Sequence, residues 1–147
     1  MDSSKKEKVV IIGFGWVGQA NALALANAGH DVSYYDVQKP EPRYKDSYAE
    51  NYNLVPRLKT VNEVDGLNTW YIVCVGDKVL SDGEQDISSI RKALDSLVGL
   101  QGGIILRSTI LPTYLKDLKF DYYVPEFLHE KKAVEECMSP HYFILGK

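Results

Sequence analysis

The sequence has little cysteine and no cysteine pair with metal-ligand spacing, which narrows the range of protein classes. Its 147 residues contain 2 cysteines, Cys74 inside an apolar run and Cys137 in a polar segment. This usage disfavours a disulfide framework and a zinc site built on Cys-x-x-Cys. We therefore predict two structural thiols in a reduced compartment, and no metal site.

The sequence also lacks an excess of basic residues and any long apolar run. Its formal net charge is −3, whereas nucleic-acid binders usually gather Lys and Arg on one face. The first apolar run, residues 9–12, is too short for a signal-peptide core or a membrane span. We therefore expect a cytoplasmic protein that binds neither nucleic acid nor membranes.

The composition that remains is that of an ordinary globular domain. Hydrophobic residues make up 45% and charged residues 25%, and the length suits a single domain over residues 1–147. Short apolar runs alternate with helix-like stretches, which is typical of a parallel sheet with helices on both faces. The predicted fold class is α/β, of the Rossmann type, with a doubly wound, mainly parallel sheet.

The pattern assigns each segment of the chain. Strands are predicted at residues 8–12, 31–35, 58–61, 69–75, 103–106, 121–124 and 142–145. Helices are predicted at residues 17–28, 86–98 and 113–118. Residues 37–55, with their prolines and tyrosines, are predicted to be loop with a short helix near residues 46–51.

A glycine-rich turn joins the first predicted strand to the first predicted helix. Residues 13–18 read Gly-Phe-Gly-Trp-Val-Gly, a G-x-G-x-x-G pattern in the context that supports a dinucleotide site. Gly13 permits the tight turn, Gly15 lets the backbone approach a pyrophosphate, and Gly18 lets the helix pack on the strand. Together with the N–H groups at Trp16 and Val17, these glycines are predicted to bind the phosphates. A turn with no ligand is the less favoured interpretation.

An acidic residue follows the second predicted strand at the spacing of a ribose ligand. Asp36 lies about 20 residues beyond the turn, where a carboxylate accepts hydrogen bonds from an adenosine ribose. A 2′-phosphate would meet like charge there, so NAD is predicted in preference to NADP. Arg43 could soften that preference, but we interpret it as a solvated surface residue.

Further motifs resemble one enzyme family. Residues 13–18 resemble the G-x-G-Y-V-G turn of the UDP-glucose/GDP-mannose dehydrogenase family, and residues 28–32 resemble its A-G-H-x-V run. Residues 107–112 resemble R/K-S-T-V-x-P, residues 125–130 resemble P-E-F-L-x-E, and residues 140–146 resemble the strand that follows. These motifs occur in family order over nearly the whole chain. The chain thus resembles the amino-terminal NAD-binding domain of a nucleotide-sugar 6-dehydrogenase.

The resemblance implies roles for individual residues. Catalytic roles are implied for Thr109 and Glu126, the latter assisting proton transfer through water; on spacing alone, a surface or capping glutamate is favoured at position 126. Further cofactor contacts are implied for the residues that end two strands and for a signature glutamate: Val75, Gly76, Ser108, Thr109 and Glu130. Substrate contacts are implied for Phe127, Leu128 and Glu130.

The sequence also departs from the family. Residues 75–78 read Val-Gly-Asp-Lys where the family has V-P-T-P or V-N-T-P, so Asp77 adds a negative charge beside the expected cofactor. The family's G-x-C-x-x-K-D cysteine motif and its central dimerising helix are not found in the sequence. Neither Cys74 nor Cys137 has the setting of that nucleophile.

Two functions therefore stay open. The first is the NAD-binding domain of a longer enzyme of nucleotide-sugar metabolism and polysaccharide biosynthesis, which oxidises the C6 alcohol of a UDP- or GDP-sugar to a carboxylate. The resemblance implies that such an enzyme forms a homodimer through regions that this sequence lacks. The second is a stand-alone NAD-binding module. In either case we expect this chain alone to be inactive, and its sequence does not specify the sugar. Another β-hydroxyacid-type dehydrogenase is disfavoured by the P-E-F-L segment.

Overall fold

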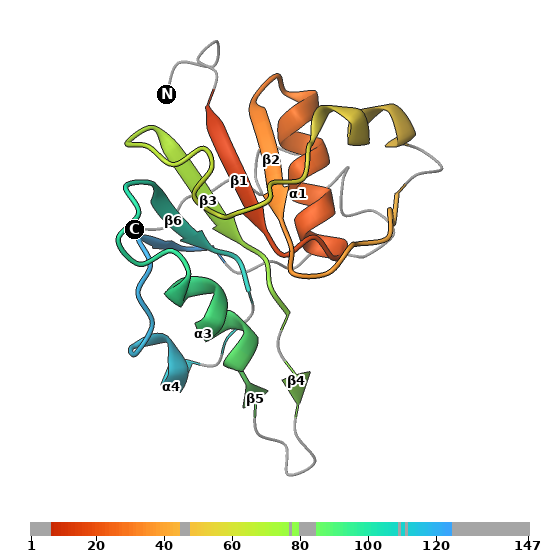
Figure 1. The fold of residues 1–147 in the computed structure, drawn as a ribbon. Coiled ribbons are helices and arrows are strands. Elements are labelled where there is room, and N and C mark those ends of the chain that lie inside the picture. Colours follow the sequence, from red (N-terminus) through yellow and green to blue (C-terminus); the bar gives the residue numbers. More distant parts are fainter. Residues whose placement is uncertain are drawn as a thin grey trace.

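A five-stranded parallel sheet forms the centre of the computed structural model, which describes residues 7–44, 48–76, 78–79, 85–108, 110 and 112–124 (Figure 1). The strand order is β2-β1-β3-β6-β7. These strands are β1 (Lys8–Ile12), β2 (Asp31–Tyr35), β3 (Thr69–Val73), β6 (Gly103–Leu106) and β7 (Tyr122–Tyr123). Two short strands, β4 (Lys78–Val79) and β5 (Gln85–Asp86), form a separate antiparallel pair.

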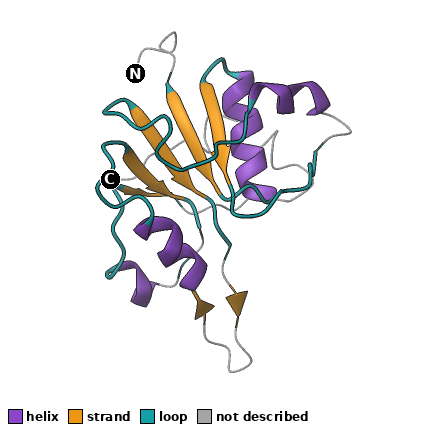
Figure 2. Cartoon of the chain, in the orientation of Figure 1, coloured by secondary structure: helices purple, strands orange, loops and turns teal. Residues whose placement is uncertain are grey.

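Helices cover both faces of the sheet (Figure 2). They are α1 (Trp16–Asn27), α3 (Ser88–Asp95) and α4 (Pro112–Leu115), with a 3-10 helix η1 (Ala49–Leu54) beside α1. Successive side chains of a strand point to opposite faces, so Ile11 packs in the cluster that contains Ala22 of α1, and Ile12 packs with Leu94 of α3. The predicted α/β class and doubly wound arrangement are confirmed.

The strand order changes direction at β1. The chain passes from β1 to β2 on one side and then returns to β3 on the other side of β1. Ile12 pairs with both Tyr35 and Val73, so the residues that follow these three strands emerge together. We call this the carboxyl edge and the opposite one the amino edge. In open α/β sheets, ligands bind at the carboxyl edge where the strand order reverses.

The loop between β2 and β3 covers the outer side of α1. The buried Tyr44 packs against Ala20, Leu23 and Ala24, so α1 is enclosed between the sheet and this loop. This enclosure explains why α1 is rich in alanine and leucine on all sides, since a helix without a polar face must be buried.

The predicted strand at residues 58–61 is wrong. Pairing with β2 is confined to a single parallel bridge between Tyr34 and Arg57. The N–H groups of Lys59 and Thr60 donate instead to Oε1 of Glu63 at 2.5 and 3.0 Å, which closes a turn. The apolar Leu58 is buried in the core rather than extended in a ladder. The predicted strand at residues 142–145 lies outside the described residues.

Candidate functional site

The turn between β1 and α1 requires glycine at two positions. Gly13 has a φ of +89°, and a Cβ added there would lie 3.0 Å from Cγ2 of Val75. A Cβ added at Gly18 would lie 1.9 Å from the carbonyl oxygen of Gly13, which no real structure tolerates. Gly18 therefore allows α1 to pack closely on β1, as the motif predicts.

Gly15 differs because open space surrounds it. It is the N-cap of α1, and a Cβ added there would have no neighbour within 4 Å. The cap has no side-chain hydrogen bond, and the first turn contains no acidic residue. The N–H groups of Trp16, Val17 and Gly18 consequently have no acceptor within the helix. Free donors, a positive helix end and open space are what a phosphate group requires.

Asp36 connects the end of β2 to this turn. Its Oδ2 accepts a hydrogen bond from the N–H of Phe14 at 2.8 Å, and its Oδ1 accepts one from Gln38 at 3.0 Å. Each carboxylate oxygen can accept a second hydrogen bond, so Asp36 fixes the turn and can still bind a ribose hydroxyl. Arg57 donates to the carbonyl oxygen of Asp36 at 2.8 Å, which places a cation beside the carboxylate.

Gln19 is a central residue that the sequence analysis missed. Its side chain is fully buried; its Nε2 donates to Phe14 O at 2.7 Å and to Glu41 O at 2.8 Å. Its Oε1 accepts from Arg43 N at 2.7 Å and from Tyr52 OH at 2.5 Å. One amide therefore joins the glycine turn to the loop that covers α1. A glutamine among alanines and leucines on a buried helix was the available signal.

An arginine stacks on the aromatic residue of the turn. The guanidinium carbon of Arg43 lies 5.2 Å from the ring centroid of Trp16, and Tyr44 meets the same ring edge-on at 5.4 Å. Arg43 is exposed, but its position is specific, because a guanidinium over an indole ring is held by cation–π attraction. Its interpretation as only a solvated surface residue is therefore incomplete.

The other predicted cofactor residues that the structure describes lie at the same edge. Ser108, which is buried, donates from Oγ to the carbonyl oxygen of Val75 at 2.6 Å, and Val75 faces Gly13. Gly76 is exposed, with nothing within 4 Å of an added Cβ. The remaining predicted site residues lie outside the described ranges: Thr109, Glu126, Phe127, Leu128 and Glu130.

Neither a protein-family model nor a curated protein sequence matches the chain, but solved structures do. A UDP-glucose dehydrogenase from Pyrobaculum islandicum has a TM-score of 0.76 and 21% identity, over 95% of this chain and 40% of that one. A GDP-mannose dehydrogenase from Pseudomonas aeruginosa has a TM-score of 0.72 and 20% identity, over 88% of this chain and 38% of that one. The chain has a Rossmann fold.

The same Rossmann fold occurs in a wider group of oxidoreductases. A 3-hydroxyisobutyrate dehydrogenase from Mycobacterium tuberculosis has a TM-score of 0.64 and 17% identity, over 89% of this chain and 44% of that one. The chain spans about two fifths of the length of the two nucleotide-sugar dehydrogenases. At these identities the likeness establishes the fold, and the chemistry has to be argued from the site.

In the described part of the Rossmann domain, no group of three or more His, Cys, Asp or Glu side chains could hold a metal ion. None of its helices is long and apolar enough to cross a membrane.

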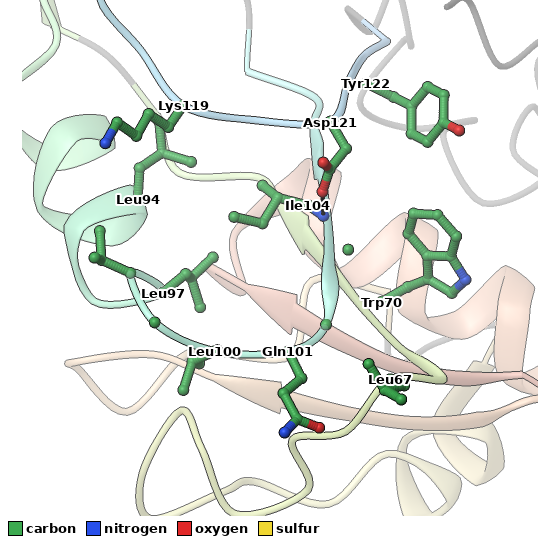
Figure 3. A pocket seen from close by; sticks show the side chains of 14 residues that line it. Leu67, Trp70, Leu94, Leu97, Leu100, Gln101, Ile104, Lys119, Asp121 and Tyr122 are labelled. Carbon is green, nitrogen blue, oxygen red and sulfur yellow. Dashed lines mark hydrogen bonds between the residues drawn. The ribbon is translucent and has the colours of Figure 1, made fainter.

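A cavity of about 690 Å³ lies at the opposite edge of the domain (Figure 3). Trp70 and Tyr122 line one side, and Leu94 and Leu97 line the other, around the amino end of β6. Because the strands are parallel, this cavity at the amino edge is separate from the glycine turn at the carboxyl edge. It contributes nothing to a dinucleotide site.

Proposed function

We propose that this Rossmann domain binds NAD as part of a nucleotide-sugar 6-dehydrogenase of the UDP-glucose/GDP-mannose dehydrogenase type. The observation that carries the proposal is the open Gly15 turn, which has N–H groups without an acceptor in the helix on one side and Asp36 on the other. The motif resemblance and the fold likeness to two nucleotide-sugar dehydrogenases support the enzyme class.

The described residues fit a dinucleotide. The N–H groups at Trp16, Val17 and Gly18 donate to the pyrophosphate, which approaches over Gly15 without meeting a side chain. Asp36 accepts from the adenosine ribose and repels a 2′-phosphate, so NAD is preferred over NADP. Val75, Gly76 and Ser108 belong to the same edge and line the nicotinamide half; when bound, the nicotinamide accepts a hydride.

The remaining roles in the proposal come from the family resemblance. Thr109 and Glu126 act on the reacting hydroxyl, with Glu126 moving a proton through water. Phe127, Leu128 and Glu130 hold the nucleotide sugar. In the proposal, a longer, homodimeric cytoplasmic protein oxidises the C6 alcohol of a UDP- or GDP-sugar, and this chain alone yields no NADH.

Calorimetric titration with NADH and NADPH tests the cofactor assignment. Gly15→Val should abolish NADH binding without unfolding the domain, because the branched side chain fills only the space reserved for the pyrophosphate. Gly66→Val is the matched control, since an added Cβ there meets only Thr69 Oγ1 at 3.8 Å. An unchanged NADH dissociation constant in a folded Gly15→Val protein would contradict the assignment.

The same titration tests the preference for NAD. The unmodified chain should bind NADH more tightly than NADPH, and Asp36→Asn should reduce the difference by removing the charge. Asparagine keeps an oxygen for the N–H of Phe14 and loses only the exposed hydrogen bond from the N–H of Gln38, so the turn between β1 and α1 is preserved. Equal or stronger binding of NADPH by the unmodified chain would show that Arg57 and Arg43, not Asp36, determine the selectivity.

A further inference from the structure

The buried side chain of Arg107 lies at the carboxyl edge, apart from the glycine turn. Arg107 directly follows β6, and its N–H donates to the carbonyl oxygen of Val73 at 2.9 Å. Only 5% of the residue is exposed. Its Nε is buried and, within the part of the chain that the structure describes, no acceptor bonds to it.

This arrangement is costly unless an anion completes it. A guanidinium stays charged and presents five N–H donors in a planar fork. A buried N–H donor that has lost its water without gaining an acceptor opposes folding. Buried polar atoms without a hydrogen bond are rare in folded proteins, and a binding role is one reason that they persist.

Arg107 lies apart from the glycine turn in the sheet. β6 lies two strands from β1 in the sheet, with β3 between them, so Arg107 is not part of the phosphate-binding turn. Beside it, the N–H of Val124 donates to Leu106 O at 2.9 Å, and Ser108 Oγ is engaged by Val75 O. The carboxylate of Asp36 lies beyond β1, where it accepts from Phe14 and Gln38.

We propose that Arg107 anchors an oxyanion, a phosphate or carboxylate group of a second ligand, at the carboxyl edge beside β6. The guanidinium fork binds two oxygens of such a group at once, which an ammonium cannot do. The inference does not depend on the assignment of NAD to the glycine turn.

Thermal unfolding of the full chain with and without inorganic phosphate, or malonate as the carboxylate probe, tests this anchor. Sodium chloride keeps the ionic strength constant. Either probe should raise the Tm of the unmodified protein; the probe that raises it more identifies the oxyanion. Arg107→Met, which keeps the length of the side chain and removes its charge, should lose this rise. Without the probes its Tm should equal or exceed that of the unmodified protein, since a buried Nε–H group without an acceptor in the described part has been removed.

Two variants separate this site from its alternatives. Gly15→Val should keep the rise in Tm, because the new side chain obstructs only the glycine turn. If the probe no longer raises the Tm of Gly15→Val but still raises that of Arg107→Met, the proposal is wrong. Arg107→Lys, which keeps the charge, should bind the effective probe about tenfold more weakly, and an unchanged affinity would likewise overturn it.

The Tm values measured without added anion show whether a carboxylate of the chain itself binds the guanidinium of Arg107. If Arg107→Met lowers the Tm and Glu126→Gln or Glu130→Gln lowers it equally, the guanidinium pairs with that carboxylate and the proposal is wrong. NADH titration of the same samples reports separately on the proposed function.

Discussion

The two edges of the sheet differ in whether their polar groups have hydrogen-bond partners within the protein. At the amino edge Asp65 accepts hydrogen bonds from Gln101 N at 2.9 Å, Gly102 N at 3.1 Å and Tyr71 OH at 3.0 Å. At the carboxyl edge, the first N–H groups of α1 have no acceptor within the helix, and the buried Nε of Arg107 has none among the described residues. The amino edge completes its own hydrogen bonds, whereas the carboxyl edge leaves donors for a ligand.

This contrast shows that a cavity need not mark the ligand site. The cavity of about 690 Å³ is at the amino edge, where the polar side chain of Asp121 is already bonded to the N–H of Ile104 at 2.7 Å. Binding specificity requires a few polar groups aimed at the ligand, and these converge at the other edge. Substitutions at the two edges should therefore separate stability from cofactor binding.

The largest effect is expected at Gly18, where a substitution should change both the stability of the fold and the binding of the cofactor. Gly18→Ala places a Cβ against the carbonyl oxygen of Gly13, so α1 must move away from β1. We expect a loss of about 3 kcal/mol or more in the free energy of unfolding, together with loss of NADH binding. Urea unfolding measures the first and calorimetry the second. Gly15→Ala, the same change in open space, is the control, and equal stability of the two variants would refute the packing argument.

A smaller effect is expected at the amino edge, on stability alone. Burial raises the pKa of Asp65, but the hydrogen bonds from Gln101, Gly102 and Tyr71 outweigh it and bring the pKa below 3.8. Asp65→Asn should cost about 1 to 2 kcal/mol at neutral pH and leave NADH binding unchanged.

The sign of the pH dependence follows from that lowered pKa. The ionised Asp65 contributes its full stabilisation above pH 3.8, the unfolded value, and loses it as the pH falls through the lower folded value. The stability difference between the unmodified protein and Asp65→Asn should thus shrink in acid. Urea unfolding over a pH series measures it, with the exposed Asp117→Asn as control. A difference that stays constant in acid would exclude this carboxylate as its source.

The smallest effect is expected at the rim of the amino-edge cavity. Leu67 is 84% exposed, so Leu67→Ala should change the free energy of unfolding by less than about 0.5 kcal/mol. Leu97 lines the same cavity but is 2% exposed, and Leu97→Ala should cost about 3 kcal/mol. Neither should alter NADH binding. A large loss in Leu67→Ala would show that this rim is covered by another part of the protein.

The strands and turns that depend only on neighbouring residues could be predicted from the sequence. Strands β1 and β2 have the predicted bounds, because β1 is a β-branched run that ends at Gly13 and β2 lies between Gly29-His30 and Asp36. The turn geometry of Gly13 and Gly18 follows from the spacing, because only glycine fits a positive φ or such a close backbone contact.

The features that depend on distant parts of the chain were not predictable. Gln19 forms its hydrogen bonds with Glu41 and Arg43 of a loop and with Tyr52 of η1, in a stretch whose sequence has no clear periodicity. Leu58 misled the strand prediction, since an apolar residue can enter the core without pairing in a sheet. In the sequence Arg107 is only the first residue of the segment that resembles R/K-S-T-V-x-P; the fold is needed to show that its Nε is buried without an acceptor in the described part.

The two tryptophans of the chain stand at opposite edges of the sheet, and this gives the domain two intrinsic optical reporters. Trp16 opens α1 at the glycine turn, whereas Trp70 lines the amino-edge cavity. Their indole rings are the chain's strongest ultraviolet emitters, so replacing Trp70 with phenylalanine assigns most of the remaining fluorescence to the turn. Quenching of that emission by NADH would be a direct spectroscopic readout of events at the carboxyl edge, and the reciprocal Trp16→Phe variant would monitor the other edge by the same measurement.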